Sequence, residues 1–367
     1  MKLRCDGRAL AGALSLVSRA LRNRTTVPAL NMVLLEAGAG HVRVTATDLE
    51  LRLRRSVPAE VSGEGAVAVP GRLLAEFAAT LGDEPVDLAG SESSLTVSTP
   101  SFRTELRGVP AADFPQSAFC TEDGIEIEVE RPALVEAIED TCFASSTDEA
   151  RPVLTGVLVC AEDGGLTFAA TDGYRVAERC ITREGGDDSL RVTVPSRALA
   201  DVARTFRDGG AVVRVLVAAT GGHIQFSDGG SEVVSRLLDG RFPSYRSIFP
   251  DSWSTTVELD AAELVRRLRA LSAFARDGAR AVRLATGDAT LQVTASAGQV
   301  GEGETRLPAA VDGAATRVAC NVRYLLEGLS RVSGRASLRL DGPLAPLVVR
   351  RPSGDPYTYL LAPVVRG

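Results

Sequence analysis

The stretch Ala170–Arg179 reads ATDGYRVAER, and an earlier stretch, Ala46–Arg55, reads ATDLELRLRR. Both open with Ala-Thr-Asp, and both follow a run of alternating apolar and polar residues, HVRVT before the first and GLTFA before the second. Alternation with period two is typical of a half-buried β-strand, and an Asp at the end of such a strand favours a turn. The chain therefore uses the same strand-and-turn pattern at least twice.

Two kinds of helical segment recur with the same order. The first kind reads RALAGAL from Arg8, RPALVEAI from Arg131 and DAAELVRRL from Asp260. The second kind reads VAVPGRLLAEFA from Val67, VTVPSRALADVA from Val192 and VACNVRYLLEGL from Val318. The third counterpart of Ala-Thr-Asp is TAS at Thr294–Ser296, where the acid is absent. We therefore predict an α+β protein of three similar units of about 120 residues, each ordered helix, strands, helix, strands and each long enough for its own core.

Composition agrees with a globular chain of several domains. The protein has 367 residues, 45% hydrophobic and 24% charged, with a net charge of −6. Its six cysteines have no C-x-x-C spacing, so we expect free thiols in a reducing cytosol. The first apolar segment resembles a signal peptide, but Leu10, Leu14, Val17 and Leu21 share one helical face, which predicts the first helix of a unit. No run of about 18 apolar residues occurs, so no transmembrane helix is expected.

The residues give little support to catalysis. Asp48 and Asp172 are the most conspicuous carboxylates, but they occupy equivalent places in different units and are expected to form turns. Only two histidines are present, and neither belongs to a recognisable catalytic motif. We expect no enzyme activity, no metal and no cofactor, and the alternative left open is a metal-dependent hydrolase that uses Asp48 or Asp172.

Arginines are placed more informatively. Lys2 is the sole lysine, so nearly all positive charge is arginine, and Arg72, Arg197 and Arg323 hold equivalent places at the second helix of each unit. Such residues can form solvated helix faces, or they can present cations to a common polyanion if the helices of all units point the same way. The charges alone leave both interpretations open.

Several motifs together resemble one family. They are ATDGYRVA in the middle unit, LLDGRFPSYRSIFP at its end, RPVLTGVLV, TTVPALNMVLLEA and the aliphatic-Pro-aliphatic tail. From MKLRCDGRALAGAL to PYTYLLAPVVRG the chain resembles the bacterial DNA polymerase III beta subunit, the replicative sliding clamp. The resemblance implies three clamp domains, which we place at 1–121, 122–251 and 252–367. It also implies a cytoplasmic, head-to-tail homodimer whose helices line a hole around duplex DNA and whose contacts with phosphates carry no sequence information.

The resemblance also implies the functional residues. The middle Ala-Thr-Asp loop would form one wall of a pocket for short apolar peptides from polymerases, the clamp loader and repair proteins. The pocket lining would be Leu154, Thr171, Gly173, Tyr174, Arg175, Val176, Pro243, Ile248, Leu360, Leu361, Ala362, Pro363 and Val364. The residues facing DNA would be Arg24, Arg72, Arg151 and Arg197. Leu106 and Phe274 would lie at the dimer interface.

The chain departs from the family pattern at three positions near the pocket. Tyr174 stands where histidine is common, Ser247 where arginine is expected and Ala362 where methionine is frequent. These departures leave open a divergent clamp paralogue, for example one that tolerates a clamp-directed inhibitor. A repeat scaffold that binds peptides but not DNA is the other alternative.

Overall fold

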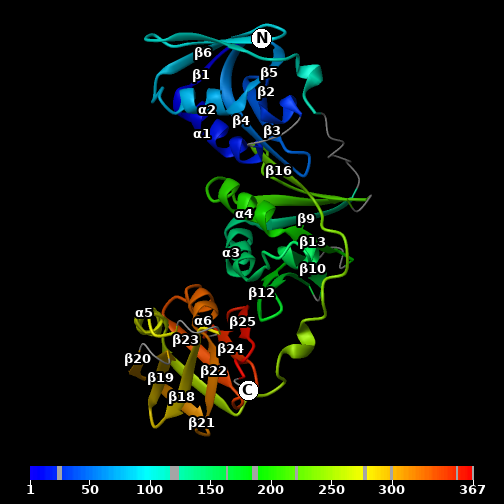
Figure 1. Cartoon of the computed structure of the whole chain (residues 1–367). Coiled ribbons are helices and arrows are strands. Elements are labelled where there is room, and N and C mark those ends of the chain that lie inside the picture. Colours follow the sequence, from blue (N-terminus) through cyan, green and yellow to red (C-terminus); the bar gives the residue numbers. More distant parts are fainter. Residues whose placement is uncertain are drawn as a thin grey trace. The chain divides into compact units, whose positions relative to one another are not determined.

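The computed structural model describes residues 1–22, 27–115, 124–162, 164–183, 189–219, 222–275, 279–297, 301–352 and 354–365. The chain forms two compact units (Figure 1). The first unit contains Met1–Val135 and Arg197–Leu237, and the second contains Glu136–Ser196 and Leu238–Gly367. The division therefore runs through the middle repeat of the sequence.

The same order of elements occurs three times along the chain, except that the third repeat has one additional strand, β21 (Ala310–Gly313). The first repeat contains β1 (Lys2–Asp6), α1 (Gly7–Val17), β2 (Met32–Gly38), β3 (His41–Thr47), β4 (Leu51–Gly63), β5 (Gly65–Pro70), α2 (Gly71–Ala78), β6 (Pro85–Gly90), β7 (Ser94–Ser98) and β8 (Arg103–Arg107). The middle repeat contains β9 (Gly124–Glu130), α3 (Arg131–Thr141), β10 (Gly156–Glu162), β11 (Gly165–Thr171), β12 (Arg175–Thr182), β13 (Arg191–Pro195), α4 (Ser196–Thr205), β14 (Val212–Ala218), β15 (His223–Ser227) and β16 (Ser231–Arg236). The third repeat contains β17 (Thr255–Asp260), α5 (Ala261–Leu271), β18 (Ala281–Gly287), β19 (Thr290–Ala297), β20 (Gly301–Pro308), β21 (Ala310–Gly313), β22 (Arg317–Asn321), α6 (Val322–Leu329), β23 (Arg335–Leu340), β24 (Leu347–Arg350) and β25 (Tyr357–Leu361).

The predicted order of elements was wrong at the start of each repeat, because a strand precedes the first helix. In the first repeat, β1 ends at Asp6, and the Asp6 carboxylate caps α1 by accepting a hydrogen bond from the Ala9 N–H at 2.8 Å. Asp260 has the same role between β17 and α5, with a 2.7 Å bond from the Glu263 N–H. A side-chain oxygen at this position satisfies a backbone donor of the first turn, so one residue ends the strand and starts the helix.

The first helix is one-faced, as the sequence predicts. Leu10, Leu14 and Val17 are fully buried, and Leu21 just beyond the helix is buried too. α1 contacts α2 in the first unit, and α5 contacts α6 in the second (Figure 1). None of the described helices is long and apolar enough to cross a membrane.

Within each unit, a strand of one sequence repeat pairs with a strand of the neighbouring repeat in the same way. In the first unit a strand path runs β8-β7-β6-β1-β4-β16-β15-β14-β9, and β3, β2 and β5 branch from β4. In the second unit the path runs β13-β10-β11-β12-β25-β24-β23-β17-β21, and β20-β19-β18-β22 form a separate sheet. Thus β16, the last strand of the middle repeat, pairs with β4 of the first repeat, and β25 pairs with the equivalent strand β12.

This recurring junction explains why the middle repeat is divided between two compact units. Its strands β14–β16 extend a sheet of the first repeat, whereas β10–β13 extend a sheet of the third. Strand pairing forms backbone hydrogen bonds and cross-strand side-chain contacts at each junction. The middle repeat therefore packs with its neighbouring repeats as well as within itself.

Strand register corrects the alignment of the third Ala-Thr-Asp counterpart. Val33 and Val282 are equivalent because they pair with Val69 and Cys320, which open the second helical segments. The registers of the hairpins β2–β3, β10–β11 and β18–β19 then make Ala46, Ala170 and Ala295 equivalent to one another. Ser296 therefore replaces the Thr, and the missing acid corresponds to Ala297, one residue later than the sequence alignment placed it.

Candidate functional site

The two Ala-Thr-Asp segments form the same hairpin turn. Asp48 accepts hydrogen bonds from the N–H groups of Glu50 and Leu51, at 3.1 and 2.8 Å. Asp172 accepts them from Tyr174 and Arg175, at 2.9 and 3.2 Å. Both carboxylates thus satisfy backbone donors of a turn, which is the role expected for them from the sequence.

The preceding threonines complete the turns. The Thr171 hydroxyl donates to the Arg175 carbonyl at 2.7 Å and accepts from the Gly173 N–H at 3.0 Å. Thr47 makes the equivalent bonds to Leu51 and from Leu49, at 3.0 and 3.1 Å. The repeated sequence is therefore explained first by a common turn geometry.

The two turns differ at the residue that must take a left-handed conformation. That residue is Leu49, with φ 77°, in the first copy and Gly173, with φ 94°, in the second. A leucine in this region is strained, whereas glycine is not. A Cβ at Gly173 would lie 3.6 Å from an Arg151 guanidinium nitrogen, which is an ordinary van der Waals contact, so the positive φ and not a lack of space favours glycine here.

Arg175 is a buried cation that anchors the second turn to the third repeat. It is 4% exposed and pairs with Asp172 at 3.0 Å and with Glu327 of α6. It also donates to the Phe143 carbonyl at 2.8 Å and stacks over the Tyr324 ring, 4.3 Å from the centroid. Since Leu51 stands at the equivalent place in the first turn, this anchor is specific to the second copy.

The surrounding groups keep Arg175 charged. Burial opposes that charge, but Tyr359 and Glu327 outweigh the effect and raise the pKa of Arg175. Burial likewise opposes ionisation of Glu327, yet hydrogen bonds from Arg323 and Arg175 lower its pKa below the usual value. The ion pair is therefore formed at neutral pH, and Arg175 supports the pocket wall from inside rather than offering a free cation to a ligand.

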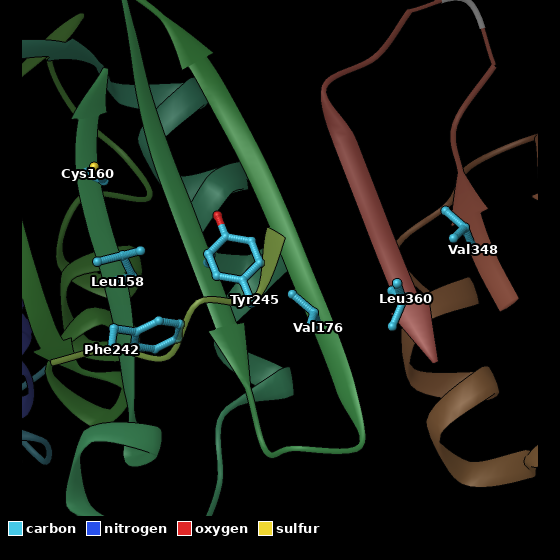
Figure 2. Close-up of a cluster of buried hydrophobic side chains, with 8 residues drawn as sticks. Leu158, Cys160, Val176, Phe242, Tyr245, Val348 and Leu360 are labelled. Atoms are coloured by element: carbon cyan, nitrogen blue, oxygen red, sulfur yellow. The ribbon is translucent and has the colours of Figure 1, made fainter. Parts of the chain in front are cut away.

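An apolar cluster lies behind this turn (Figure 2). Its buried members are Leu158, Cys160, Ala169, Val176, Phe242, Tyr245, Val348 and Leu360. Val176 and Leu360 face each other across the β12–β25 ladder, and Phe242 and Tyr245 come from the segment that leaves the middle repeat. Figure 2 shows the Tyr245 ring lying over β-strands of the middle repeat, with Leu360 and Val348 on β25 and β24. Three separated parts of the chain thus build one wall.

The structure brings most predicted pocket residues to this wall. Thr171, Arg175 and Val176 are buried, and the Ala362 N–H donates to the Tyr174 carbonyl at 2.8 Å, which ties the tail to the turn. Leu360 and Leu361 are buried on β25. Tyr174, at 64% exposed, and Ile248, at 49% exposed, are the large apolar groups available to a ligand, with Pro243 and Ala362 also exposed.

Two predicted pocket residues are also held by backbone hydrogen bonds to neighbouring segments. Leu154 is buried in the short helical segment Pro152–Thr155, where its carbonyl accepts from the Ser146 N–H at 2.8 Å. Val364 donates its N–H to the Ala319 carbonyl of β22 at 2.8 Å, and its side chain lines a separate groove over β18 and β22. Pro363 is half-buried between these contacts.

The predicted DNA-contacting arginines are dispersed over helices and turns. Arg72 and Arg197 are exposed in the first turns of α2 and α4, and Arg197 donates to the Arg19 carbonyl at 3.2 Å. Arg151 is paired with Asp148 at 3.1 Å, with its side chain half exposed. Arg24 lies outside the described residues. Arg72 has no ion pair with any part of the chain that the structure describes, so it is available for an external anion.

The predicted interface residues sit at two strand edges. Leu106 lies on β8 but is 7% exposed, because its side chain packs into its own unit. Phe274 is half-buried against Gly303 of β20, whose Cβ would lie 3.0 Å from a ring carbon of Phe274. Both positions are therefore on or against an edge strand, although the Leu106 side chain is already covered.

An exposed apolar patch near β8 was not predicted from the sequence. Leu73 is 52% exposed on α2 and Phe102 is 63% exposed just before β8. Phe102 packs edge-on against Phe77 of α2, with ring centroids 6.3 Å apart. The signal was present in GRLLAEFA, where Leu73 and Phe77 are four residues apart and so share one helical face.

No group of three or more His, Cys, Asp or Glu side chains among the described residues could hold a metal ion. Cys5, Cys142, Cys160, Cys180 and Cys320 are free thiols, as expected, and Cys120 lies outside the described residues.

Comparison with known families decides what the three repeats are. Residues 1–118, 128–244 and 246–365 match the N-terminal, central and C-terminal domains of the DNA polymerase III beta subunit. The chain belongs to the bacterial beta sliding clamp family. It is an α+β clamp with three similar domains, and the family is a non-catalytic processivity factor in DNA replication.

Relatives and solved structures agree over the full length. The beta sliding clamp of Synechococcus elongatus is 33% identical and that of Streptomyces coelicolor 31% identical, each over 99% of both chains. A Pseudomonas aeruginosa clamp bound to griselimycin matches with a TM-score of 0.94 and 26% identity over 100% of both chains. The C. crescentus clamp, with PEG bound to a region proposed to tether the beta motif, matches with a TM-score of 0.90 and 28% identity, over 100% of this chain and 99% of that one.

Proposed function

We propose that this clamp acts as a head-to-tail homodimer that encircles duplex DNA. It holds DNA polymerase, the clamp loader and repair proteins through short apolar peptides. The observation that carries the proposal is the pair of strand edges left over by the recurring junction. Each junction pairs the last strand of one repeat with the strand after the first hairpin of the repeat before it. By that rule two strands remain to be joined: β8, the last strand of the first repeat, and β20, the strand after the first hairpin of the third repeat. Each has one neighbour among the described strands.

The register of the existing junctions supports specific contacts between two copies. Carrying the pairs of β16 with β4 over to β8 and β20 places Arg103 opposite Glu304, which is a complementary pair. It also places Glu105 opposite Glu302, a like-charged pair that is unfavourable by itself and is offset by Arg107 diagonal to Glu302. These charged side chains are exposed. Two copies joined at β8 and β20 close after two interfaces and leave neither of these two edges free, which is the condition for a ring rather than a filament.

The apolar patch supplies the driving force for this association. Leu73, Phe77 and Phe102 lie beside β8, and Phe274 lies against β20. An exposed patch of this kind marks an interaction surface in a soluble protein. Removing each large side chain from water contributes about 1.5–3 kcal/mol, whereas exposed ion pairs contribute less than about 1 kcal/mol.

The dimer is tested by replacing both Leu73 and Phe102 with Arg. The double variant should sediment as a monomer at low micromolar concentration, and Phe274→Arg should shift the same equilibrium. Val212→Arg is a matched control, because Val212 is 41% exposed on β14, near the other end of the strand path from β8. A double variant that stays dimeric would contradict the assembly, while Arg103→Glu combined with Glu304→Arg should associate better than either single variant.

We place the peptide site at the second Ala-Thr-Asp turn, with Tyr174, Ile248, Pro243 and the tail at its mouth and the apolar cluster behind it. The ligands named for the P. aeruginosa and C. crescentus clamps support a binding site of this kind in the family. Aliphatic walls with an open glycine turn and few polar groups suit an apolar anchor residue.

The site is tested with a fluorescent clamp-binding peptide from a polymerase. Ile248→Glu places a charge at a half-exposed position and should weaken binding about tenfold or more while leaving the dimer intact. Val212→Glu serves as the control for an added surface charge. Peptide affinity unchanged in the Ile248→Glu dimer would move the site elsewhere. Gly173 is a poor position for this test, because its positive φ makes any side chain disturb the turn itself.

We keep the domain limits at 1–121, 122–251 and 252–367, which fall between β8 and β9 and between the segment Arg246–Ile248 and β17. The matched family ranges support these limits to within seven residues. A role on replicating bacterial DNA places the clamp in the cytoplasm.

A further inference from the structure

We propose that Asp201 is an internal counterion that competes with DNA phosphates for two arginines and so keeps the contact between the clamp and duplex DNA weak. Asp201 lies on α4 and is 1% exposed. Its carboxylate pairs with Arg19, in the short helical segment Ser18–Ala20 after α1, and with Arg204 of α4 at 3.4 Å. The inference rests on the DNA contact proposed above for Arg197.

Arg197 connects this ion-pair cluster to the proposed DNA-facing surface. Its guanidinium group donates to the Arg19 carbonyl at 3.2 Å. Arg204 follows Arg197 by seven residues, which is about two helical turns, so the two arginines share one face of α4. A surface that presents Arg197 to DNA therefore presents Arg19 and Arg204 as well. Their side chains are 39% and 52% exposed, so a phosphate can reach both.

The Asp201 carboxylate occupies donors that a phosphate would otherwise use. The Nε–H of Arg19 and an Nη–H of Arg204 both donate to Oδ1 of Asp201. Carboxylates and phosphates are both acceptors of charge-assisted hydrogen bonds from guanidinium groups, so they compete for the same arginines.

This competition lowers the affinity for DNA. Sequence-independent DNA binding depends on the counterions that protein cations displace, and an arginine that is already neutralised by a carboxylate displaces fewer of them. A closed ring is retained on DNA by its closure, so weak phosphate contacts suffice and leave it free to move along the duplex.

The three repeats use the equivalent carboxylate differently. Glu76, Asp201 and Glu327 hold the same position in α2, α4 and α6. Glu76 is exposed and forms no ion pair with the described part of the chain, whereas Glu327 pairs with Arg323 of its own helix at 2.8 Å. Glu76 therefore provides a matched control, because it is an acid at the same helical position that restrains no described arginine.

The test measures binding of the full chain to a short labelled duplex by fluorescence anisotropy at several salt concentrations. Asp201→Asn should bind about fivefold or more tightly near 0.1 M salt, and its slope of log K against log salt should steepen by about 0.9 for each arginine released. Glu76→Gln removes the same charge and should change the affinity by less than about twofold. Sedimentation and thermal unfolding show whether each variant remains a folded dimer.

Arg19→Gln gives a second measurement that does not require the Asp201 variant to fold. In the wild-type background it should reduce the salt slope by much less than about 0.9, because Asp201 already neutralises Arg19. In the Asp201→Asn background the same change should remove part of the gained affinity. The two backgrounds form a double-mutant cycle that isolates the coupling between the residues.

Three outcomes would overturn the inference. Weaker DNA binding by a folded Asp201→Asn dimer would show that the carboxylate orients the arginines for phosphate. An equal gain with Glu76→Gln would reduce the effect to net charge. A loss of about 0.9 in slope for Arg19→Gln in the wild-type background would show that Asp201 does not restrain Arg19.

A further comparison separates this inference from the proposed DNA role. If replacing Arg72 and Arg197 with Ala weakens DNA binding while Asp201→Asn leaves it unchanged, only the counterion inference fails. If neither change affects DNA binding, the proposed DNA role of these helices fails as well.

Discussion

Asp48 and Asp172 show how one residue type serves two repeats without serving catalysis. Each carboxylate accepts two backbone N–H bonds, and each has an arginine beside it, Arg22 at 3.5 Å in the first repeat and Arg175 at 3.0 Å in the second. A carboxylate held in this way is a turn-forming group with little freedom to bind a metal. The family assignment and these contacts together remove the hydrolase alternative.

The thiols of Cys5 and Cys320, which are buried, and of Cys142, which is partly buried, should be chemically inert at moderately alkaline pH. Burial raises the pKa of Cys5, Cys142 and Cys320 to about 12, so at pH 8 these groups are protonated and lack the reactive thiolate. We expect iodoacetamide at pH 8 to leave all three unmodified in the folded clamp and to alkylate them in urea, as followed by peptide mass spectrometry. Rapid modification of any of the three in the native protein would contradict this burial.

Glu327 should stabilise the clamp in a pH-dependent way. Its pKa is lowered in the folded state by Arg323 and Arg175, so its contribution is present above the unfolded value of about 4.5 and is lost as pH falls through the folded pKa. Glu327→Gln should lower the free energy of unfolding by roughly 1–3 kcal/mol at pH 7, because the buried Arg175 loses its charged partner. Urea denaturation should show the difference shrinking below about pH 4, and a constant difference would exclude the ion pair as its cause.

At the scale of elements, the two hairpin turns have the same hydrogen bonds and different surroundings. At the first junction the Arg236 N–H donates to the Glu50 carbonyl at 2.8 Å, and their side chains form an exposed ion pair at 3.5 Å. At the second junction the same backbone bond joins Ala362 to Tyr174, and Tyr174 and Ala362 carry no charged side chains to form such a pair. Leu49 and the ion pair fill the first turn, which supports placing the peptide site at the second.

The left-handed residue of the second turn offers a direct test of that geometry. Gly173→Ala should destabilise the clamp by roughly 1 kcal/mol, because alanine is strained at φ 94°. Gly12→Ala is the control, since Gly12 lies within α1 with open space around it, and there the change should be neutral or stabilising. Thermal unfolding of the two variants would separate the outcomes, and equal melting temperatures would refute the strain argument.

At the scale of the whole molecule, repetition explains how an acidic protein can hold DNA. Arg72, Arg197 and Arg323 occupy the first turn of α2, α4 and α6, so the same place in each repeat carries a cation. Arg323 is engaged by Glu327 at 2.8 Å, whereas Arg72 and Arg197 have no acidic partner in the described part of the chain. The excess of acid can then lie elsewhere without opposing DNA at these helices.

The DNA role predicts a sequence-independent, salt-sensitive interaction. Replacing Arg72 and Arg197 with Ala should weaken binding to duplexes of different sequence equally and reduce the slope of log K against log salt by about 0.9 per lost phosphate contact. Arg43→Ala is the control, since Arg43 is exposed on β3 rather than on a helix. An unchanged slope in the double variant would show that these helices do not face DNA.

Much of the architecture could be predicted from the sequence because it depends on local patterns. The three repeats, the one-faced helix at Leu10–Leu21 and the turn-forming role of Asp48 and Asp172 follow from residue spacing and from hydrogen bonds made within a few residues. The strand that opens each repeat was missed because β1 has only five residues and its last residue, Asp6, also caps a helix. The register of the third turn was missed because alignment by letters cannot see which strand a residue pairs with.

The sequence by itself determined the family, the repeat and the residues that meet at the second turn, because these are properties of short segments. Only the tertiary structure decided which edges remain open and which groups are already satisfied. It joined β16 to β4 and β25 to β12, left β8 and β20 at the ends of their sheets, buried Arg175 in an ion pair and exposed Leu73, Phe102 and Leu344. The physical reason is that pairing, burial and charge compensation depend on residues more than 100 positions apart, whose meeting is fixed by the fold and not by local sequence.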